Sequence, residues 1–239
     1  IERLKVSELI ILGAGVHGRI LLDVCMDAGI WVKGFLEDGK NAGDKVLGVP
    51  IIGGFDKIED AAFISAHDFI VGIGGSQDKR RYWSEILRAR GGRLRTVTHP
   101  SSAISRFADV GEGCFIWQNT TIMHQAKIGD FAVIGCNSSI GDNCEIGDNV
   151  FIAGGCQVNG RVIVEEDAYV GSGAVISPGC RVGRRSVVGL NSTVTRDIPA
   201  ETVCAGPAAK IVVRGTDHIM SHIDGSKSGA RIISGVSSE

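Results

Sequence analysis

An aliphatic side chain stands at every sixth position in the second half of the chain, and the register holds from residue 104 to residue 194. A second track, four residues after each member of the first, holds small or slim side chains. A period of six fits neither an α-helix, with about 3.6 residues per turn, nor an alternating strand, with a period of about 2. It is typical of a triangular solenoid with one short strand per hexad and three hexads per coil.

The two tracks have different predicted places in such a coil. The aliphatic track is expected to fill the interior, and it consists of Ile104, Val110, Ile116, Ile122, Ile128, Ile134, Ile140, Ile146, Ile152, Val158, Val164, Val170, Ile176, Val182, Val188 and Val194. The small track is expected to fit the crowded inner corners, and it includes Ala108, Cys114, Thr120, Ala126, Ala132, Ser138, Cys144, Val150, Cys156, Val162, Ala168, Ala174, Cys180, Ser186 and Ser192. Glycine, at 34 residues, supplies turn conformations that a Cβ atom disfavours.

The residues before the hexads read as an α/β unit. The stretch LIILGAGVHG predicts an apolar strand, a Gly-x-Gly-x-x-Gly turn through Gly13, Gly15 and Gly18, and then a helix. Backbone N–H groups at a helix N-terminus favour anions, so this turn predicts a phosphate-approach loop. The strand WVKGFLED ends in Glu37 and Asp38, at the spacing where an acid can bind a ribose hydroxyl.

A third strand, DFIVGIGG, leads into a polar segment with Ser76, Lys79 and Arg80 at the start of another helix. Only about 95 residues precede the hexads, which is enough for one mononucleotide-binding half of a doubly wound domain. We therefore expect a nucleotide-binding domain over residues 1–98, a β-helix over 99–214 and a polar tail over 215–239.

Composition excludes several classes of partner. The net charge of −2 gives no basic footprint for nucleic acid or anionic lipid. We expect no membrane span and a cytoplasmic location, because no apolar run reaches about 18 residues and the first residues lack a signal-peptide pattern. The seven cysteines include no C-x-x-C pair, and four of them stand on the small track, so they are expected to be reduced packing residues.

The hexads resemble the left-handed β-helix of bacterial hexapeptide acyltransferases. The ordered set GAGVHG, GFLED, VGIGGSQDKR and THPSSAIS, followed at once by hexads, further resembles the nucleotide-sugar N-acetyltransferases of the bacillosamine, perosamine and sialic-acid pathways. This resemblance covers residues from about 8 to 212. It implies an α/β half-Rossmann domain followed by a left-handed parallel β-helix, assembled as a homotrimer with active sites between neighbouring prisms. A carbonic anhydrase of the same fold would need a histidine cluster for zinc, and the hexads contain only His124.

The resemblance also implies the ligands: a UDP- or GDP-linked amino sugar in the first domain and acetyl-CoA, or another acyl-CoA, on the β-helix, with no metal. The implied nucleotide-sugar contacts are Gly13, Gly15, His17, Gly18, Glu37, Asp38, Gly74, Lys79 and Arg80. For His17, capping of the helix is an equal alternative. The implied acyl-CoA contacts are Gly160, Ser172, Gly173, Arg196, Ala205 and Lys210.

The catalytic residue is where the sequence departs from the family. The position of the family's catalytic histidine falls on Asp142, within GDNC. His124 precedes Asp142 by eighteen residues, which is one full coil, so the two are expected to stack at one corner. Acyl transfer to an amine needs a base, and we hypothesise that His124 is that base and Asp142 its orienting partner. A solvent-facing His124 without function and a covalent route through Cys136 remain alternatives.

Three functions are consistent with these residues. The first is an acyl-CoA-dependent N-acyltransferase acting on a nucleotide-linked amino sugar. The second is a sugar O-acyltransferase of the same architecture, which needs a stronger base than an amine acceptor does. The third is a non-catalytic nucleotide-sugar-binding homologue that lacks the usual histidine.

Overall fold

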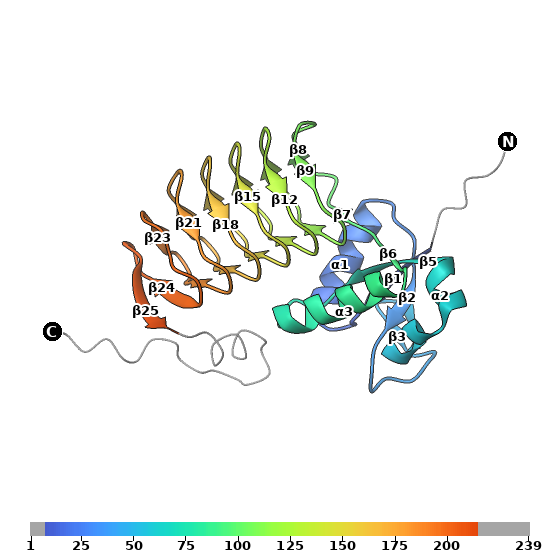
Figure 1. Cartoon of the computed structure of the whole chain (residues 1–239). Helices are drawn as coiled ribbons and strands as arrows, with labels where there is room; N and C mark the ends of the chain where they lie inside the picture. The colour runs from blue at the N-terminus through green and yellow to red at the C-terminus, as the bar shows by residue number, and fades with distance from the viewer. Residues whose placement is uncertain (1–7, 215–239) are drawn as a thin grey trace.

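The computed structural model describes residues 8–214 and shows two joined parts, an α/β domain and a three-sided prism (Figure 1). The α/β domain is built from β1 (Glu8–Leu12), α1 (Val16–Asp27), β2 (Val32–Leu36), β3 (Lys45–Val46), β4 (Val49–Gly53), η1 (Phe55–Glu59), α2 (Ala61–Ala66), β5 (His67–Val71), α3 (Gln77–Ala89) and β6 (Arg93–Leu94).

One six-stranded sheet forms the middle of the α/β domain, in the order β3-β4-β2-β1-β5-β6. All neighbours pair in parallel except β3 and β4, which form an antiparallel hairpin. The chain moves outward from β1 to β2 and β4, and then returns to place β5 on the other side of β1. The strand order therefore reverses between β1 and β5, and ligands of open parallel sheets bind outside such a switch point.

The prism is a stack of two-residue strands on three faces. Face 1 contains β7 (Val97–Thr98), β10 (Phe115–Ile116), β13 (Val133–Ile134), β16 (Phe151–Ile152), β19 (Tyr169–Val170) and β22 (Val187–Val188), followed by β24 (Thr202–Ala205) and β25 (Lys210–Arg214). Face 2 contains β8 (Ala103–Ile104), β11 (Thr121–Ile122), β14 (Ser139–Ile140), β17 (Gln157–Val158), β20 (Val175–Ile176) and β23 (Thr193–Val194). Face 3 contains β9 (Asp109–Val110), β12 (Lys127–Ile128), β15 (Glu145–Ile146), β18 (Ile163–Val164) and β21 (Arg181–Val182).

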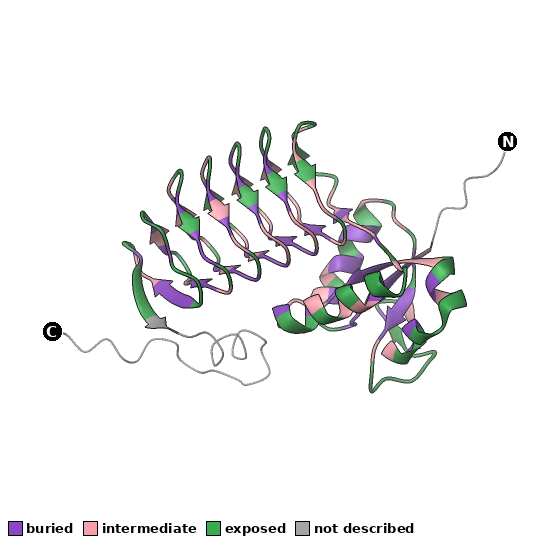
Figure 2. Ribbon diagram, viewed as in Figure 1, coloured by how far each residue is buried: buried purple, intermediate pink, exposed green. Residues whose placement is uncertain are grey.

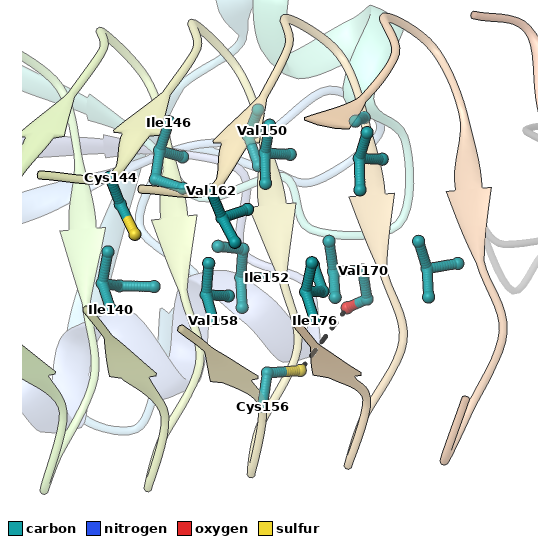
Figure 3. Close-up of a cluster of buried hydrophobic side chains, with 14 of the residues drawn as sticks. Ile140, Cys144, Ile146, Val150, Ile152, Cys156, Val158, Val162, Val170 and Ile176 are labelled. Atoms are coloured by element: carbon teal, nitrogen blue, oxygen red, sulfur yellow. Dashed lines mark hydrogen bonds between the residues drawn. The ribbon is translucent and has the colours of Figure 1, made fainter. Parts of the chain in front are cut away.

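From β7 to β23, paired strands of the prism are parallel and eighteen residues apart, as Ile122 is from Ile140 and Ile128 is from Ile146. At the end of face 1, β22 pairs in parallel with β24, and β24 pairs with β25 in the antiparallel direction. The aliphatic track fills the interior, as Figure 3 shows for the middle coils, and from Ile116 onward its members are at most 3% exposed. Ile104, in the first coil, has no coil before it and is 36% exposed. The small track is likewise buried at the corners, from Cys114 to Ser192.

The corners of the prism repeat one backbone conformation. Every sixth residue from position 113 to position 191 has a positive φ, between 51° and 76°. Glycine and asparagine occupy most of these positions, since both tolerate the left-handed region. The exceptions include Phe131, with φ of 59°, whose ring is buried beneath α3.

The α/β domain packs directly on face 1. Phe115 and Val133 point outward from this face into the hydrophobic core that also contains Leu9 and Leu21 of the α/β domain. The burial colours of Figure 2 show the lower face of the prism buried where α3 and the sheet approach it. Gln77, at the start of α3, adds three hydrogen bonds from Nε2 to the carbonyls of Asn149, Asp167 and Ala168, at 3.1, 3.1 and 3.0 Å. The two parts are therefore held together by apolar packing and by polar contacts.

The predicted half-Rossmann domain followed by a left-handed parallel β-helix is confirmed. Strand β7, which the sequence placed at the end of the first domain, pairs with β10 and opens face 1 of the prism. The expected polar tail, residues 215–239, lies outside the described residues. In the part of the chain that the structure describes, no helix has the length and apolar character needed to cross a bilayer.

Candidate active site

A cavity of about 780 Å³ opens at the switch point of the six-stranded sheet. Its floor is formed by the segments that follow β1 and β5, and its remaining walls come from α1, α3, the segments after β2 and β4, and face 1 of the prism. The lining residues are Gly13, Gly15, Val16, His17, Ile20, Glu37, Asp38, Phe55, Gly72, Ile73, Gly74, Gly75, Ser76, Lys79, Trp83 and Phe151. Phe151 belongs to β16, so the prism contributes directly to the cavity.

Two glycine-rich turns form the floor because larger residues would not fit. Gly13 has φ of +100°, and a Cβ atom there would lie 3.1 Å from the carbonyl oxygen of Gly72. A Cβ atom on Gly72 would lie 2.8 Å from the Cα of Gly18. At Gly15, which also lines the cavity, an added Cβ would by contrast meet nothing within 4 Å. The turns thus bring backbone close to any ligand in the cavity.

Acidic and basic side chains lie at different places around the cavity. Glu37 accepts a hydrogen bond from the backbone N–H of Ala14, inside the first glycine turn. The carboxylate therefore accepts from a backbone N–H that could otherwise have donated to a phosphate. Its negative charge also makes that turn less favourable for an anion. Lys79, in the first turn of α3, is the cationic residue among those that line the cavity, and it is exposed. Ser76 caps the same helix by accepting from the N–H of Lys79 at 3.3 Å.

His17 fills the wall between the glycine turn and the prism. Its ring lies 5.4 Å from Phe115, 5.7 Å from Trp117 and 6.0 Å from Phe151, measured between centroids. Burial lowers the pKa of His17 to about 3, with a smaller contribution from the Arg80 guanidinium. The ring is thus neutral at physiological pH. Its Nε2 atom is buried without a hydrogen-bond partner among the described residues.

The far corner of the prism, between faces 2 and 3, carries the candidate base. His124 and Asp142 lie there on consecutive coils, and both are exposed. The His124 ring packs against the ring of Phe107 at 5.1 Å, and the Asp142 carboxylate accepts from Nδ2 of Asn143 at 3.2 Å. Within residues 8–214 no hydrogen bond joins the two side chains. The structure therefore stacks them as expected but leaves them unpaired.

Known families match both parts of the chain. The PglD N-terminal domain family matches residues 8–86, and the bacterial transferase hexapeptide family, a model of six repeats, matches residues 107–141 and 125–160. A solved histidine-to-asparagine mutant of perosamine N-acetyltransferase from Caulobacter crescentus, in complex with CoA and GDP-perosamine, is 27% identical. The alignment covers 88% of this chain and 99% of that one, with a TM-score of 0.81. Together these matches support the bacterial nucleotide-sugar N-acetyltransferase family for this chain.

Two further solved structures agree with this assignment. The acetyltransferase domain of PglB from Neisseria gonorrhoeae FA1090, in complex with acetyl coenzyme A, is 25% identical over 86% of this chain and 99% of that one, with a TM-score of 0.80. WeeI from Acinetobacter baumannii AYE is 26% identical over 86% and 99%, with a TM-score of 0.77. A search of curated proteins found no match. The Caulobacter and Neisseria proteins are acetyltransferases, and the likeness to them supports an acyltransferase assignment for this chain.

Most of the expected nucleotide-sugar residues lie around the one cavity. Gly13, Gly15, His17, Glu37, Asp38, Gly74 and Lys79 line it, and Gly18 supports the first glycine turn from behind.

Arg80 is placed differently from the expectation. It is 1% exposed, and it donates from Nη2 to the carbonyl of Asn149 at 2.9 Å and from Nε to that of Phe131 at 3.3 Å. Because α3 turns this side chain toward the prism, its charge stands behind the cavity wall, 5.5 Å from the ring of Phe151.

The residues of this chain that are expected to contact acyl-CoA lie on the prism, on both sides of face 2. Gly160 and Arg196 share the far corner with Asp142, and a Cβ atom on Gly160 would lie 2.8 Å from Asp142 Oδ1. Ser172 and Gly173 lie at the corner between faces 1 and 2. Ala205 ends β24, and Lys210 begins β25. These positions are compatible with one elongated ligand along face 2.

Among the lining residues that sequence reasoning missed are the three aromatic side chains of the cavity: Phe55, Trp83 and Phe151. Trp83 lies four residues after Lys79, on the same face of α3, so helical spacing could have indicated it. Phe55 and Phe151 come from parts of the chain with no ligand motif, and only the folded arrangement brings them to the cavity. No group of three or more histidine, cysteine or acidic side chains suited to a metal ion occurs among residues 8–214.

Proposed function

We propose that the protein is an N-acyltransferase that moves an acyl group from acyl-CoA, acetyl-CoA in the first instance, to an amino group on a UDP- or GDP-linked sugar. The observation that carries the proposal is the cavity itself, since it is lined by two glycine turns of the α/β domain and by Phe151 of the prism. It thus adjoins the two ligand-binding parts that the family combines. The similar Caulobacter enzyme, solved with CoA and GDP-perosamine, supports the same pair of ligands.

The cavity and the candidate base lie on opposite sides of one chain. The α/β domain covers face 1, whereas His124 stands at the corner where faces 2 and 3 meet. In a triangular prism this corner is the one opposite face 1. A single chain therefore does not bring His124 to its own cavity, and a neighbouring copy has to supply it.

A cyclic homotrimer with its axis along the prisms satisfies this requirement. Rotation about such an axis keeps each residue at its own height along the prism. His124 lies in the same coil as Phe115 and Trp117, the residues that contact His17 beside the cavity. The neighbour's His124 then stands level with the cavity, and face 2, with the expected acyl-CoA residues on either side, lies along the cleft between prisms.

The proposed reaction forms one bond, breaks another and moves one proton. Acyl-CoA supplies a thioester, which is reactive toward amines. The sugar amine forms a C–N bond to the acyl carbon while the C–S bond breaks, and the proton lost by nitrogen passes to the His124 imidazole and from there to the leaving thiolate. Asp142, one coil further on, lies close enough to stabilise the imidazolium electrostatically, since neighbouring coils are separated by about 4.8 Å.

The proposal is tested by mixing the protein with acetyl-CoA and a panel of UDP- and GDP-linked 4-amino sugars while free thiol is measured. We expect thiol release that depends on the amino sugar. His124→Ala should lower turnover by at least about a hundredfold, while Gln125→Asn, at the next position, which is also exposed, should leave it unchanged. Wild-type rates in the histidine variant would reject this base.

A rescue variant separates chemistry from folding. Asp142→His in the His124→Ala background returns an imidazole to the family's position, one coil away, and is expected to recover at least about tenfold of the lost rate. Sugar binding without thiol release by the wild-type chain would instead favour the non-catalytic homologue, which the aspartate at position 142 makes a specific alternative.

A further inference from the structure

A pair of aromatic rings forms one part of the cavity wall. Phe55, at the start of η1, and Trp83, in the middle of α3, both line the cavity and are half-buried. Their ring centroids are 4.7 Å apart and their planes meet at 66°. In an edge-to-face pair, the ring that offers its edge keeps both of its own faces uncovered by its partner.

The pair is held in place by a backbone hydrogen bond to Phe55 and by packing against one of the apolar cores of the α/β domain. The backbone N–H of Phe55 donates to Asp38 Oδ1 at 2.9 Å, which ties η1 to the end of β2. Trp83 packs, together with Phe55 and Ile73, against the core that contains Leu12 and Phe69. The rings are thus fixed by their surroundings before any ligand arrives, which lowers the entropy lost on binding.

Charged groups lie on either side of this pair. Lys79 is one helical turn before Trp83 on the same face of α3, and it is an exposed cation of the cavity. Asp38 lies on the other side, and its second oxygen, Oδ2, has no hydrogen-bond partner among the described residues. A ligand with an anionic group, a flat ring and an N–H donor in that order would match cation, aromatic wall and carboxylate.

The geometry points to Phe55 and Trp83 as the stacking platform for the nucleobase of the nucleotide-sugar, with the diphosphate beside Lys79 and a base N–H facing Asp38. This inference rests on the proposed function and adds to it the direction in which the nucleotide lies. The base then occupies the aromatic wall, and the sugar is left at the wall where His17 of the α/β domain packs against Phe151 of the prism.

The inference is tested by calorimetric binding of UDP and GDP to the full chain, with inorganic pyrophosphate as a probe that has charge but no base. Trp83→Leu keeps an apolar side chain in the core but removes the aromatic face. It should weaken binding of the preferred nucleotide roughly 5- to 150-fold and leave pyrophosphate affinity within about twofold. Trp83→Phe retains a ring and should lose less than about fivefold.

The matched control is Trp31→Leu, which makes the same replacement at an indole that is 67% exposed and not among the residues that line the cavity. Its nucleotide affinity should equal that of the wild type. Nucleotide binding that is unchanged in Trp83→Leu, or a loss that affects pyrophosphate equally, overturns the platform but leaves the proposed function standing. If neither UDP nor GDP binds the wild-type chain, the proposed function fails and the platform fails with it.

Discussion

His17 connects the cavity to the prism at the scale of a single residue. Its ring is surrounded by Phe115, Trp117 and Phe151, and burial lowers its pKa from 6.5 to about 3. Folding therefore favours the neutral imidazole, while the unfolded chain binds a proton below the ordinary pKa. The sequence left two roles open for His17, ligand contact and capping of α1. His17 does not cap the helix, since the N-cap of α1 is Gly15 and no side chain hydrogen-bonds there.

This burial predicts an acid-dependent loss of stability. Above pH 6.5 the imidazole is neutral in both states and contributes no pH dependence. As the pH falls from 6.5 toward 3, the unfolded state takes up a proton that the folded state refuses, so the free energy of unfolding falls by up to about 1.4 kcal/mol per pH unit from this residue. His17→Gln should remove this component of the slope. Urea unfolding at pH 6.5 and pH 5 measures it, and an identical slope in the two proteins would contradict the assignment.

Phe131 is the residue that the repeat alone would not have predicted. Its position in the hexad requires a positive φ, which a bulky side chain adopts at a cost of roughly 1–2 kcal/mol. The ring is buried, and the Arg88 guanidinium lies 4.4 Å from its centroid. The backbone strain is therefore offset by packing between α3 and the prism.

We expect Phe131→Gly to lower the free energy of unfolding by roughly 2–4 kcal/mol. The lost ring accounts for about 3–5 kcal/mol, and relief of the strained φ returns roughly 1 kcal/mol. Asn137→Gly, at the equivalent position of the next turn and exposed, is the matched control and should change stability by less than about 0.5 kcal/mol. A variant at position 131 as stable as this control would show that the ring does not hold the two parts together.

At the scale of the element, the corners of the prism are held by short side chains that donate to the backbone fifteen residues later. Thr120 donates to Gly135 at 3.1 Å, Ser138 donates to Ala153 at 3.0 Å, and the thiol of Cys144 donates to Asn159 at 3.0 Å. The small track thus supplies hydrogen bonds as well as little bulk. The cysteines fit this structural role, since burial raises the pKa of Cys156 to about 11.

Ser138 makes this testable, because its hydroxyl also accepts from the N–H of Cys156 at 3.1 Å. Ser138→Ala leaves a buried carbonyl and a buried N–H without this partner, and it should cost about 1–3 kcal/mol of unfolding free energy. Ser139→Ala removes a hydroxyl from the next residue, in strand β14, and should cost less than about 0.5 kcal/mol. Equal losses in thermal or urea unfolding would argue against the corner hydrogen bonds.

The prism was predictable from the sequence because its contacts are repetitive and local: a residue meets its neighbour eighteen positions away, so one period determines the interior. The first domain was predictable as far as its glycine turns. The orientation of α3 was not, because it depends on packing against Phe131 and Asn149, far away in the sequence. The sequence therefore suggests Arg80 as a cavity residue, but folding buries this cation behind the cavity wall. The indole of Trp83 lines the cavity instead.

At the scale of the whole molecule, the proposed active site is divided between two chains. Each chain carries a complete cavity on one side of its prism and a candidate base at the opposite corner. A variant that blocks the cavity and a variant that lacks the base would thus damage different halves of each site. Gly15→Phe is suited to the first purpose, because Gly15 lines the cavity and an added Cβ atom there meets no atom within 4 Å.

Co-assembly of these two variants tests the account most directly. Gly15→Phe and His124→Ala, each inactive alone, are co-expressed in equal amounts with different tags, and mixed trimers are isolated and assayed for amino-sugar-dependent thiol release. If neighbours share sites, each mixed trimer has one of its three sites with an intact cavity and an intact base, whichever variant is present twice, so about a third of the wild-type activity should return. Mixed trimers as inactive as the separate variants, beside an active wild type, would contradict the shared site.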